Sequence, residues 1–235
     1  MMPNGKTICV VVASLLLGLS FCSPLRADDP VIVPVKVTGY VAYCEGYLDM
    51  MISVTQGWRK LPGLDVILNG QRARETSAGS YNYACTIPGA LPVVGERVKL
   101  TIAKPPLVPG GRSTPFVTAT GEIRSLLELT APVDGDTVPP TAVAVSVSYR
   151  GGEAPYKLSI CQVLAGNRCG RVDFPGCPGM GCALPMTLFL PGWNYSFNLF
   201  APIGSITFSG AVHPDSHIVL RQKHSHIVTI GGPRM

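Results

Sequence analysis

The sequence predicts an all-β protein made of two antiparallel β-sandwich domains that follow an export signal. Apolar and polar residues alternate along several short segments, which is typical of strands with one buried face. The 26 glycines and 22 prolines supply the many turns that short strands require. Apolar residues make up 46% of the chain and charged residues 14%, which favours a folded protein with a sizeable core.

Residues 1–27 are predicted to be a signal peptide. Lys6 precedes an apolar run over residues 8–21, which is shorter than the about 20 residues of a transmembrane helix. Ala27 is the expected cleavage position. An uncleaved signal anchor is one alternative, and the residues before Cys22 resemble a lipobox, which would place a lipid anchor on Cys22. We therefore expect an exported protein that is periplasmic, on the cell surface or secreted, with no transmembrane segment in the mature chain.

The first predicted domain covers residues 28–124. Valines at even spacing indicate its first strand, and Asn69-Gly70 is a turn at which positive φ is easily adopted. Its predicted strands cover residues 33–41, 48–56, 65–68, 80–86, 98–102 and 116–123. A proline- and glycine-rich loop over residues 104–115 is one candidate binding surface.

The second predicted domain covers residues 125–235, and its alternation is clearest in the strand over residues 143–149. Further strands are predicted over residues 127–131, 156–161, 186–190, 195–200, 205–212, 217–220 and 225–230. A Cys-, Gly- and Pro-rich insertion over residues 164–182 interrupts the pattern and is the second candidate binding surface. Tyr195 is expected to fill a tyrosine-corner or core position.

Three segments of the second half resemble bacterial immunoglobulin-like domains and the repeat domains of bacterial surface proteins. They are residues 130–138 (TAPVDGDTV), 147–156 (VSYRGGEAPY) and 190–197 (LPGWNYSF). The resemblance implies an immunoglobulin-like sandwich from a bacterial source, acting as a spacer, adhesive or binding module, and it transfers no functional residue. It does not reach the first half, whose sandwich rests on alternation and size alone.

Cysteine usage predicts disulfides in an oxidising compartment. The mature chain keeps six cysteines: Cys44, Cys85, Cys161, Cys169, Cys177 and Cys182. The first two are alone in their domain and are predicted to pair with each other. The other four can form two bonds in three ways. The combination of Cys161–Cys169 with Cys177–Cys182 is favoured, because short flexible connections let near neighbours meet. A four-thiolate zinc site is the alternative, although the spacing lacks the usual knuckle.

The four histidines all lie in the last quarter of the chain: His213, His217, His224 and His226. The last two share one face if their segment is a strand, and a pair of neutral imidazoles can bind zinc, copper or nickel. The hypothesis is a transition-metal site, with Asp215 as a further ligand. An exposed polar hairpin without a metal is the alternative.

Two further groups could bind ligands. Trp58 and Trp193 are candidate stacking platforms for a sugar, and core packing is the alternative for each. Asp134 and Asp136 could offer oxygens to calcium, but two carboxylates are few for this ion and an Asp-Gly turn explains them.

The sequence predicts no enzyme and no cofactor. It holds no Gly-x-Ser-x-Gly elbow, His-Glu-x-x-His motif, phosphate loop or dinucleotide fingerprint. Lys and Arg exceed Asp and Glu by five but are scattered, which argues against a nucleic-acid partner. We expect an exported structural, adhesive or envelope-assembly protein that contacts another envelope or surface protein, or a glycan. A small-ligand binder for carbohydrate or a transition metal is the main alternative, and an exported hydrolase with a dispersed site is the third.

Overall fold

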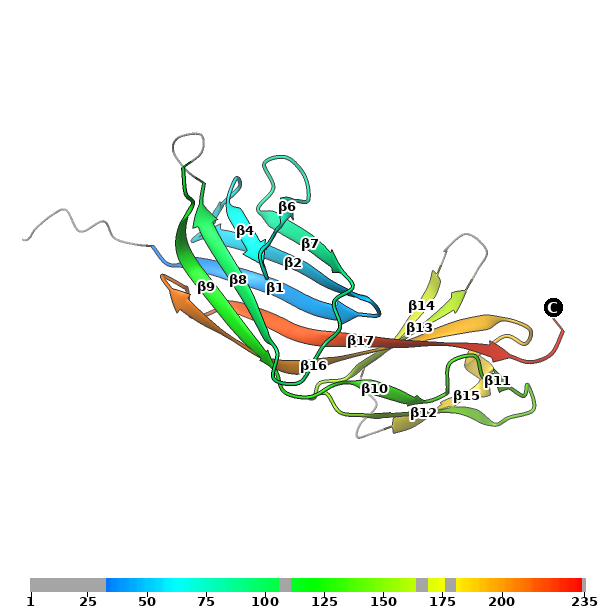
Figure 1. Cartoon of the computed structure of the whole chain (residues 1–235). Helices are drawn as coiled ribbons and strands as arrows, with labels where there is room; N and C mark the ends of the chain where they lie inside the picture. The colour runs from blue at the N-terminus through cyan, green and yellow to red at the C-terminus, as the bar shows by residue number, and fades with distance from the viewer. Residues whose placement is uncertain (1–32, 106–110, 164–168, 176–180, 234–235) are drawn as a thin grey trace, which may run out of the picture. The chain divides into compact units, whose positions relative to one another are not determined.

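The computed structural model describes residues 33–105, 111–163, 169–175 and 181–233, the third range without its side chains (Figure 1). The predicted signal peptide, Cys22, Cys177 and parts of both candidate loops therefore lie outside the described residues. The described chain is built of strands with one short 3-10 turn, and its sheets are mainly antiparallel. This confirms the predicted all-β fold class. Within the same ranges, none of the helical segments is long and apolar enough to cross a membrane.

The first half contributes nine strands. They are β1 (Val35–Cys44), β2 (Tyr47–Gln56), β3 (Arg59–Lys60), β4 (Asp65–Leu68), β5 (Gln71–Arg72), β6 (Arg74–Glu75), β7 (Asn82–Pro88), β8 (Arg97–Lys104) and β9 (Thr114–Ile123). Two long strands from the end of the chain join them, β16 (Asn194–Gly210) and β17 (His217–Ile230). Neighbouring strands follow the order β4-β8-β9-β16-β17-β1-β2-β7, in which β1 and β17 are parallel.

A short segment joins the two ends of this sheet. Strand β5 pairs with β4 and strand β6 pairs with β7, and only Ala73 separates β5 from β6. The Ala73 amide donates to the carbonyl of Val66 on β4 at 2.8 Å. Residues 71–75 therefore pair with both ends of the sheet and close it into a ring, which removes the open edges that the outermost strands would otherwise present.

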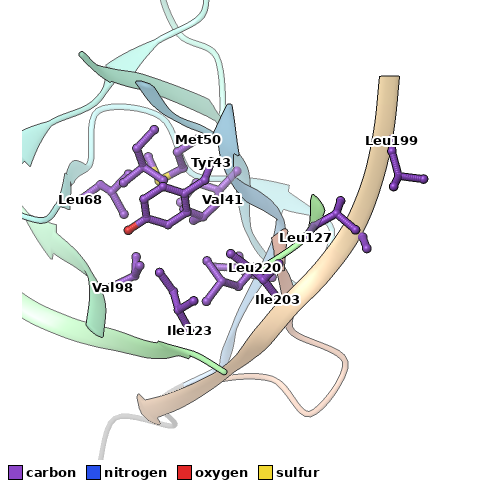
Figure 2. Close-up of a cluster of buried hydrophobic side chains, with 14 of the residues drawn as sticks. Val41, Tyr43, Met50, Leu68, Val98, Ile123, Leu127, Leu199, Ile203 and Leu220 are labelled. Atoms are coloured by element: carbon purple, nitrogen blue, oxygen red, sulfur yellow. The ribbon is translucent and has the colours of Figure 1, made fainter. Parts of the chain in front are cut away.

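The ring encloses the apolar faces of its strands. Figure 2 shows Tyr43, Met50, Leu68, Val98 and Ile123 directed into one interior. Each of these side chains is at most 1% exposed. Burial of a side chain of this size contributes about 1.5–3 kcal/mol, so the alternation read from the sequence is the main source of stability in this half.

The second half forms two facing sheets. Its strands are β10 (Glu128–Ala131), β11 (Thr137–Val138), β12 (Ala144–Arg150), β13 (Lys157–Val163), β14 (Cys169–Pro175) and β15 (Gly181–Pro185), followed by the 3-10 turn η2 (Met186–Leu188). Strands β10, β12 and β15 form one sheet, while β14, β13, β16 and β17 are neighbours in the other, with β11 paired to β17. The strand predicted over residues 186–190 is wrong, because the amide of Phe189 donates to the Met186 carbonyl and closes a turn there.

Aromatic side chains fill the space between these sheets. The Phe189 ring lies 5.0 Å from that of Tyr195 and 5.9 Å from that of Phe197, between ring centroids. The Tyr195 hydroxyl accepts a hydrogen bond from the Leu190 amide, five residues upstream, at 2.7 Å. This bond has the geometry of a tyrosine corner and confirms the role expected for Tyr195.

Strands β16 and β17 take part in both halves. Residues 195–200 of β16 pair with β13, and residues 204–210 pair with β9. Residues 217–222 of β17 pair with β1, and residues 229–230 pair with β11. The boundary between residues 124 and 125 stays a prediction, and the structure adds that residues 204–222 contribute to the ring of the first half.

Candidate functional site

Among the described residues, the most exposed aromatic side chain lies at the tip of the β2–β3 hairpin. Strand β7 accompanies β2 only as far as Ser53, and β2 continues beyond it. The chain then turns back, so that Lys60 pairs with Thr55 and Arg59 with Gln56. Trp58 occupies the turn and its side chain is 88% exposed. Because the hairpin extends past the neighbouring strand, the indole is open to solvent.

The base of the hairpin is fixed by hydrogen bonds. The Leu61 amide donates to the Val54 carbonyl at 3.2 Å. The Tyr83 hydroxyl donates to the Leu61 carbonyl at 2.7 Å and accepts from the Leu64 amide at 3.0 Å. Tyr83 is 1% exposed, so a buried side chain on β7 secures the segment that follows β3. The hairpin thus presents Trp58 from a defined position.

Two cationic side chains near the β2–β3 hairpin lie against aromatic side chains. The Arg59 guanidinium is 5.4 Å from the centroid of the Trp58 ring, and the Lys60 ammonium is 4.7 Å from that of Tyr81. Neither cation forms an ion pair with the residues that the structure describes. We call Trp58, Arg59, Lys60 and Tyr81 the Trp58 cluster.

The nearby carboxylates have other partners. Glu75 accepts hydrogen bonds from the amides of Gly63 and Gly79, the latter at 3.0 Å. Asp65 is buried and pairs with Arg72. Both carboxylates are engaged by these partners and not by Arg59 or Lys60, so the Trp58 cluster retains a positive character.

Trp193 is placed differently from Trp58. It is partly buried and packs against the hydrophobic core of the second half. Of the two tryptophans predicted as stacking platforms, only Trp58 presents an open ring. The sequence alone did not distinguish the two tryptophans, because the exposure of Trp58 depends on how far β2 extends beyond β7.

The structure separates the four histidines into two pairs. His213 and His217 flank Asp215 before and at the start of β17, where the Asp215 amide donates to His213 Nδ1 at 3.2 Å. His224 and His226 lie farther along β17, with ring centroids 5.0 Å apart. Seven residues of strand place the pairs about 23 Å apart. No group of three or more potential metal ligands occurs within the described part of the chain. The metal hypothesis is thus reduced to pairs.

The second pair makes contacts with the backbone. His224 Nδ1 accepts from the Leu129 amide at 3.4 Å, and His226 Nδ1 lies 2.7 Å from the Pro132 carbonyl, to which it donates. Burial and the neighbouring His226 lower the pKa of His224. Both imidazoles therefore help to attach the β10 segment to β17, which gives them a structural role.

The predicted disulfide between Cys44 and Cys85 is wrong. Both residues carry free thiols. Cys44 lies on β1 opposite Tyr47 of β2, whereas Cys85 lies on β7 opposite Met50 of β2. Strand β2 thus separates them, and two strands with one between them are about 10 Å apart, beyond the about 7 Å over which cysteines can be bridged.

The cysteines of the second half behave as the sequence suggested in part. Cys161 and Cys182 each take part in a disulfide bond. The side chains of Cys169 and Cys177 lie outside the described residues, so the favoured pairing stays a prediction. The bonded state of Cys161 and Cys182 argues against a site of four zinc-bound thiolates.

A polar groove of about 250 Å³ lies on the outer face of β8, β9 and β16. Its charged lining residues are Arg97, Glu122 and Arg124. The Thr207 hydroxyl, also in the lining, donates to the carbonyl of Thr120 at 3.2 Å. Since this hydroxyl is used by the backbone and the charged side chains are exposed, the groove offers less to a ligand than the Trp58 cluster.

No family model and no curated protein matches this chain. Among solved structures, one described as DIP-gamma IG1+IG2 is 8% identical, covers 83% of this chain and 100% of its own, and has a TM-score of 0.22. A marsupial T cell receptor is 11% identical, with coverage of 79% and 73% and a TM-score of 0.23. Scores this low carry no argument, so the fold assignment rests on the strand pairing described above.

Proposed function

We propose that this protein is an exported, non-enzymatic component that acts by surface contact, and that the Trp58 cluster is its contact site. Export rests on the predicted signal peptide. The observation that carries the contact site is an indole that is 88% exposed on a hairpin whose base is fixed. Its partner belongs to the envelope or cell surface, as a protein or a glycan.

The energetics favour a binding role for such a residue. An indole buries about 150–250 Å² on a partner, which corresponds to about 4–6 kcal/mol before the costs of association. Tryptophan, tyrosine and arginine are the residues that most often dominate binding energy at interfaces. The Trp58 cluster contains all three types, together with Lys60, and each of its cations lies against one of its aromatic rings.

The test is attachment of the purified protein to isolated envelopes of its source cells, measured as a saturation curve with fluorescently labelled protein. We expect Trp58→Ala to lower the affinity at least about tenfold. The matched control is Val143→Ala, since Val143 is 90% exposed but lies in the second half. Circular dichroism and thermal melting verify that both variants fold. Equal binding by the wild type and Trp58→Ala would refute the assignment of the contact site.

A further inference from the structure

We infer that the Trp58 cluster binds an acidic polysaccharide, a chain of sugar rings that carry carboxylate or sulfate groups. This inference rests on the proposed contact function and names the chemistry of its partner. It depends on two features of the cluster, the pairing of each aromatic ring with a cation and the lack of carboxylates on those cations.

The cluster repeats one unit twice. Trp58 is accompanied by Arg59, and Tyr81 is accompanied by Lys60. Backbone hydrogen bonds of Val54 connect the two units. Its amide donates to the Tyr81 carbonyl at 3.0 Å, and its carbonyl accepts from the amide of Leu61, the residue after Lys60. A polymer that carries apolar sugar faces and anionic groups matches this composition, because a sugar can pack on the exposed Trp58 indole while its anions meet Arg59 and Lys60.

The charge of the cluster selects for an anion. Arg59 and Lys60 form no ion pair with the described residues, while Glu75 binds backbone amides. A cation held on an aromatic ring gains about 0.5–1 kcal/mol at an exposed site. It therefore keeps most of its capacity to bind a carboxylate or sulfate. A neutral sugar would use the rings and leave both charges unanswered.

The position of the cluster argues for a glycan over a membrane or a large protein interface. Trp58 is flanked by Gly57 and Arg59, so the tip offers one large apolar side chain, whereas interfacial membrane binding scales with buried apolar area. A stable protein interface needs about 800 Å² on each partner, with energetic residues surrounded by a rim that excludes water. One exposed indole at a hairpin tip is far from that area, whereas a flexible polysaccharide can bind along the hairpin.

The experiment uses the full mature chain and four defined polymers in isothermal titration calorimetry. Polygalacturonate and dextran sulfate are acidic sugars, dextran is a neutral sugar, and polyglutamate is an acidic polymer without sugar rings. We expect binding to the acidic sugars, weaker binding at high salt, and at least about tenfold weaker binding to dextran and polyglutamate. Binding of only one acidic sugar also supports the inference and identifies the anion.

Three variants separate the contributions. Trp58→Ala and the double variant Arg59→Ala/Lys60→Ala are each expected to lower the affinity for the acidic sugars at least about tenfold. The control is Arg97→Ala/Lys99→Ala, which removes two exposed cations from β8 and should change the affinity less than about twofold. An equal loss in this control would show that net charge alone governs binding, which overturns the inference.

Other outcomes also overturn it. Equal binding of polyglutamate would show that sugar rings are not read, and equal binding of dextran would show that the anion is not read. Preference for anionic phosphatidylglycerol vesicles over both acidic sugars would assign the cluster to a membrane. If neither acidic sugar binds, while Trp58→Ala still loses attachment to envelopes, the inference fails and the proposed contact function stands.

Discussion

A single buried hydroxyl offers the sharpest test of how the hairpin is held. Tyr83 lies on β7 with 1% of its side chain exposed, and its hydroxyl both donates to the Leu61 carbonyl and accepts from the Leu64 amide. Burial raises the pKa of Tyr83, so the phenol stays protonated and remains a donor at neutral pH. Replacing Tyr83 by phenylalanine removes both hydrogen bonds and leaves the ring in place.

The expected cost follows from these two bonds. Each contributes about 1 kcal/mol net, and the backbone groups left behind belong to residues that are only half-buried, so water can reach them. Tyr83→Phe should therefore lower the free energy of unfolding by about 2 kcal/mol. For a chain of this size, that change lowers the melting temperature by about 4–8 °C.

Urea denaturation followed by tryptophan fluorescence measures the free energy, and calorimetry gives the melting temperature. Tyr81→Phe is the matched control, because no hydrogen bond of its hydroxyl is found within the described residues and its loss should cost less than about 0.5 kcal/mol. If Tyr83→Phe is as stable as the wild type, or if both variants lose the same amount, the buried hydroxyl does not secure the hairpin.

Three further predictions follow from particular residues. The pKa of His224 in the folded state lies below its unfolded value of about 6.5. Its contribution to stability is therefore complete above pH 6.5 and is lost as the pH falls towards the folded-state pKa. The urea midpoint should drop between pH 7 and 5, and it should drop less in His224→Gln. Gly39→Ala should cost at least about 2 kcal/mol in the same assay, because φ is +147° and the new Cβ would lie 2.2 Å from a carbonyl oxygen of β2. Alkylation of the unreduced, unfolded protein should modify Cys44 and Cys85, and a peptide linking the two in mass spectrometry would contradict the structure.

Local alternation was sufficient to predict most strands. In β8, Val98, Leu100 and Ile102 are buried while Arg97 and Lys99 are exposed, as period-two spacing requires. Such a pattern depends only on neighbouring residues and on one buried face, so the sequence contains it in full. The all-β class follows from the sum of these patterns.

Long-range pairing could not be predicted in the same way. Residues 71–75 close the ring with two short strands of mostly exposed residues, which carry no apolar pattern. Strand β16 continues through Pro202 and Gly204, where the sequence suggests an interruption. The backbone of Glu122 passes so close to Gly204 that a Cβ there would meet its carbonyl oxygen at 2.0 Å. A glycine that allows such an approach looks like any turn glycine in the sequence.

The prediction of a Cys44–Cys85 disulfide failed for a related reason. An even number of cysteines in an exported chain indicates bonds but contains no register. Pairing by elimination assigned Cys44 to Cys85, and the position of β2 between their strands was not encoded in their spacing. The Trp58 cluster shows the same limit, since Trp58 was a candidate by residue type, whereas Tyr81 enters the cluster only through the pairing of β2 with its neighbours.

The shared strands make the two halves depend on each other. A fragment that ends at residue 124 would lack the parts of β16 and β17 that lie between β9 and β1, so both of those strands would expose unpaired amides and carbonyls. Ile203 and Leu220, which are at most 1% exposed, would also be missing from the interior of the ring. The Trp58 hairpin is built on β2, which pairs with β1 along its whole length. The proposed contact site in the first half therefore needs β16 and β17 to hold the strands that support it.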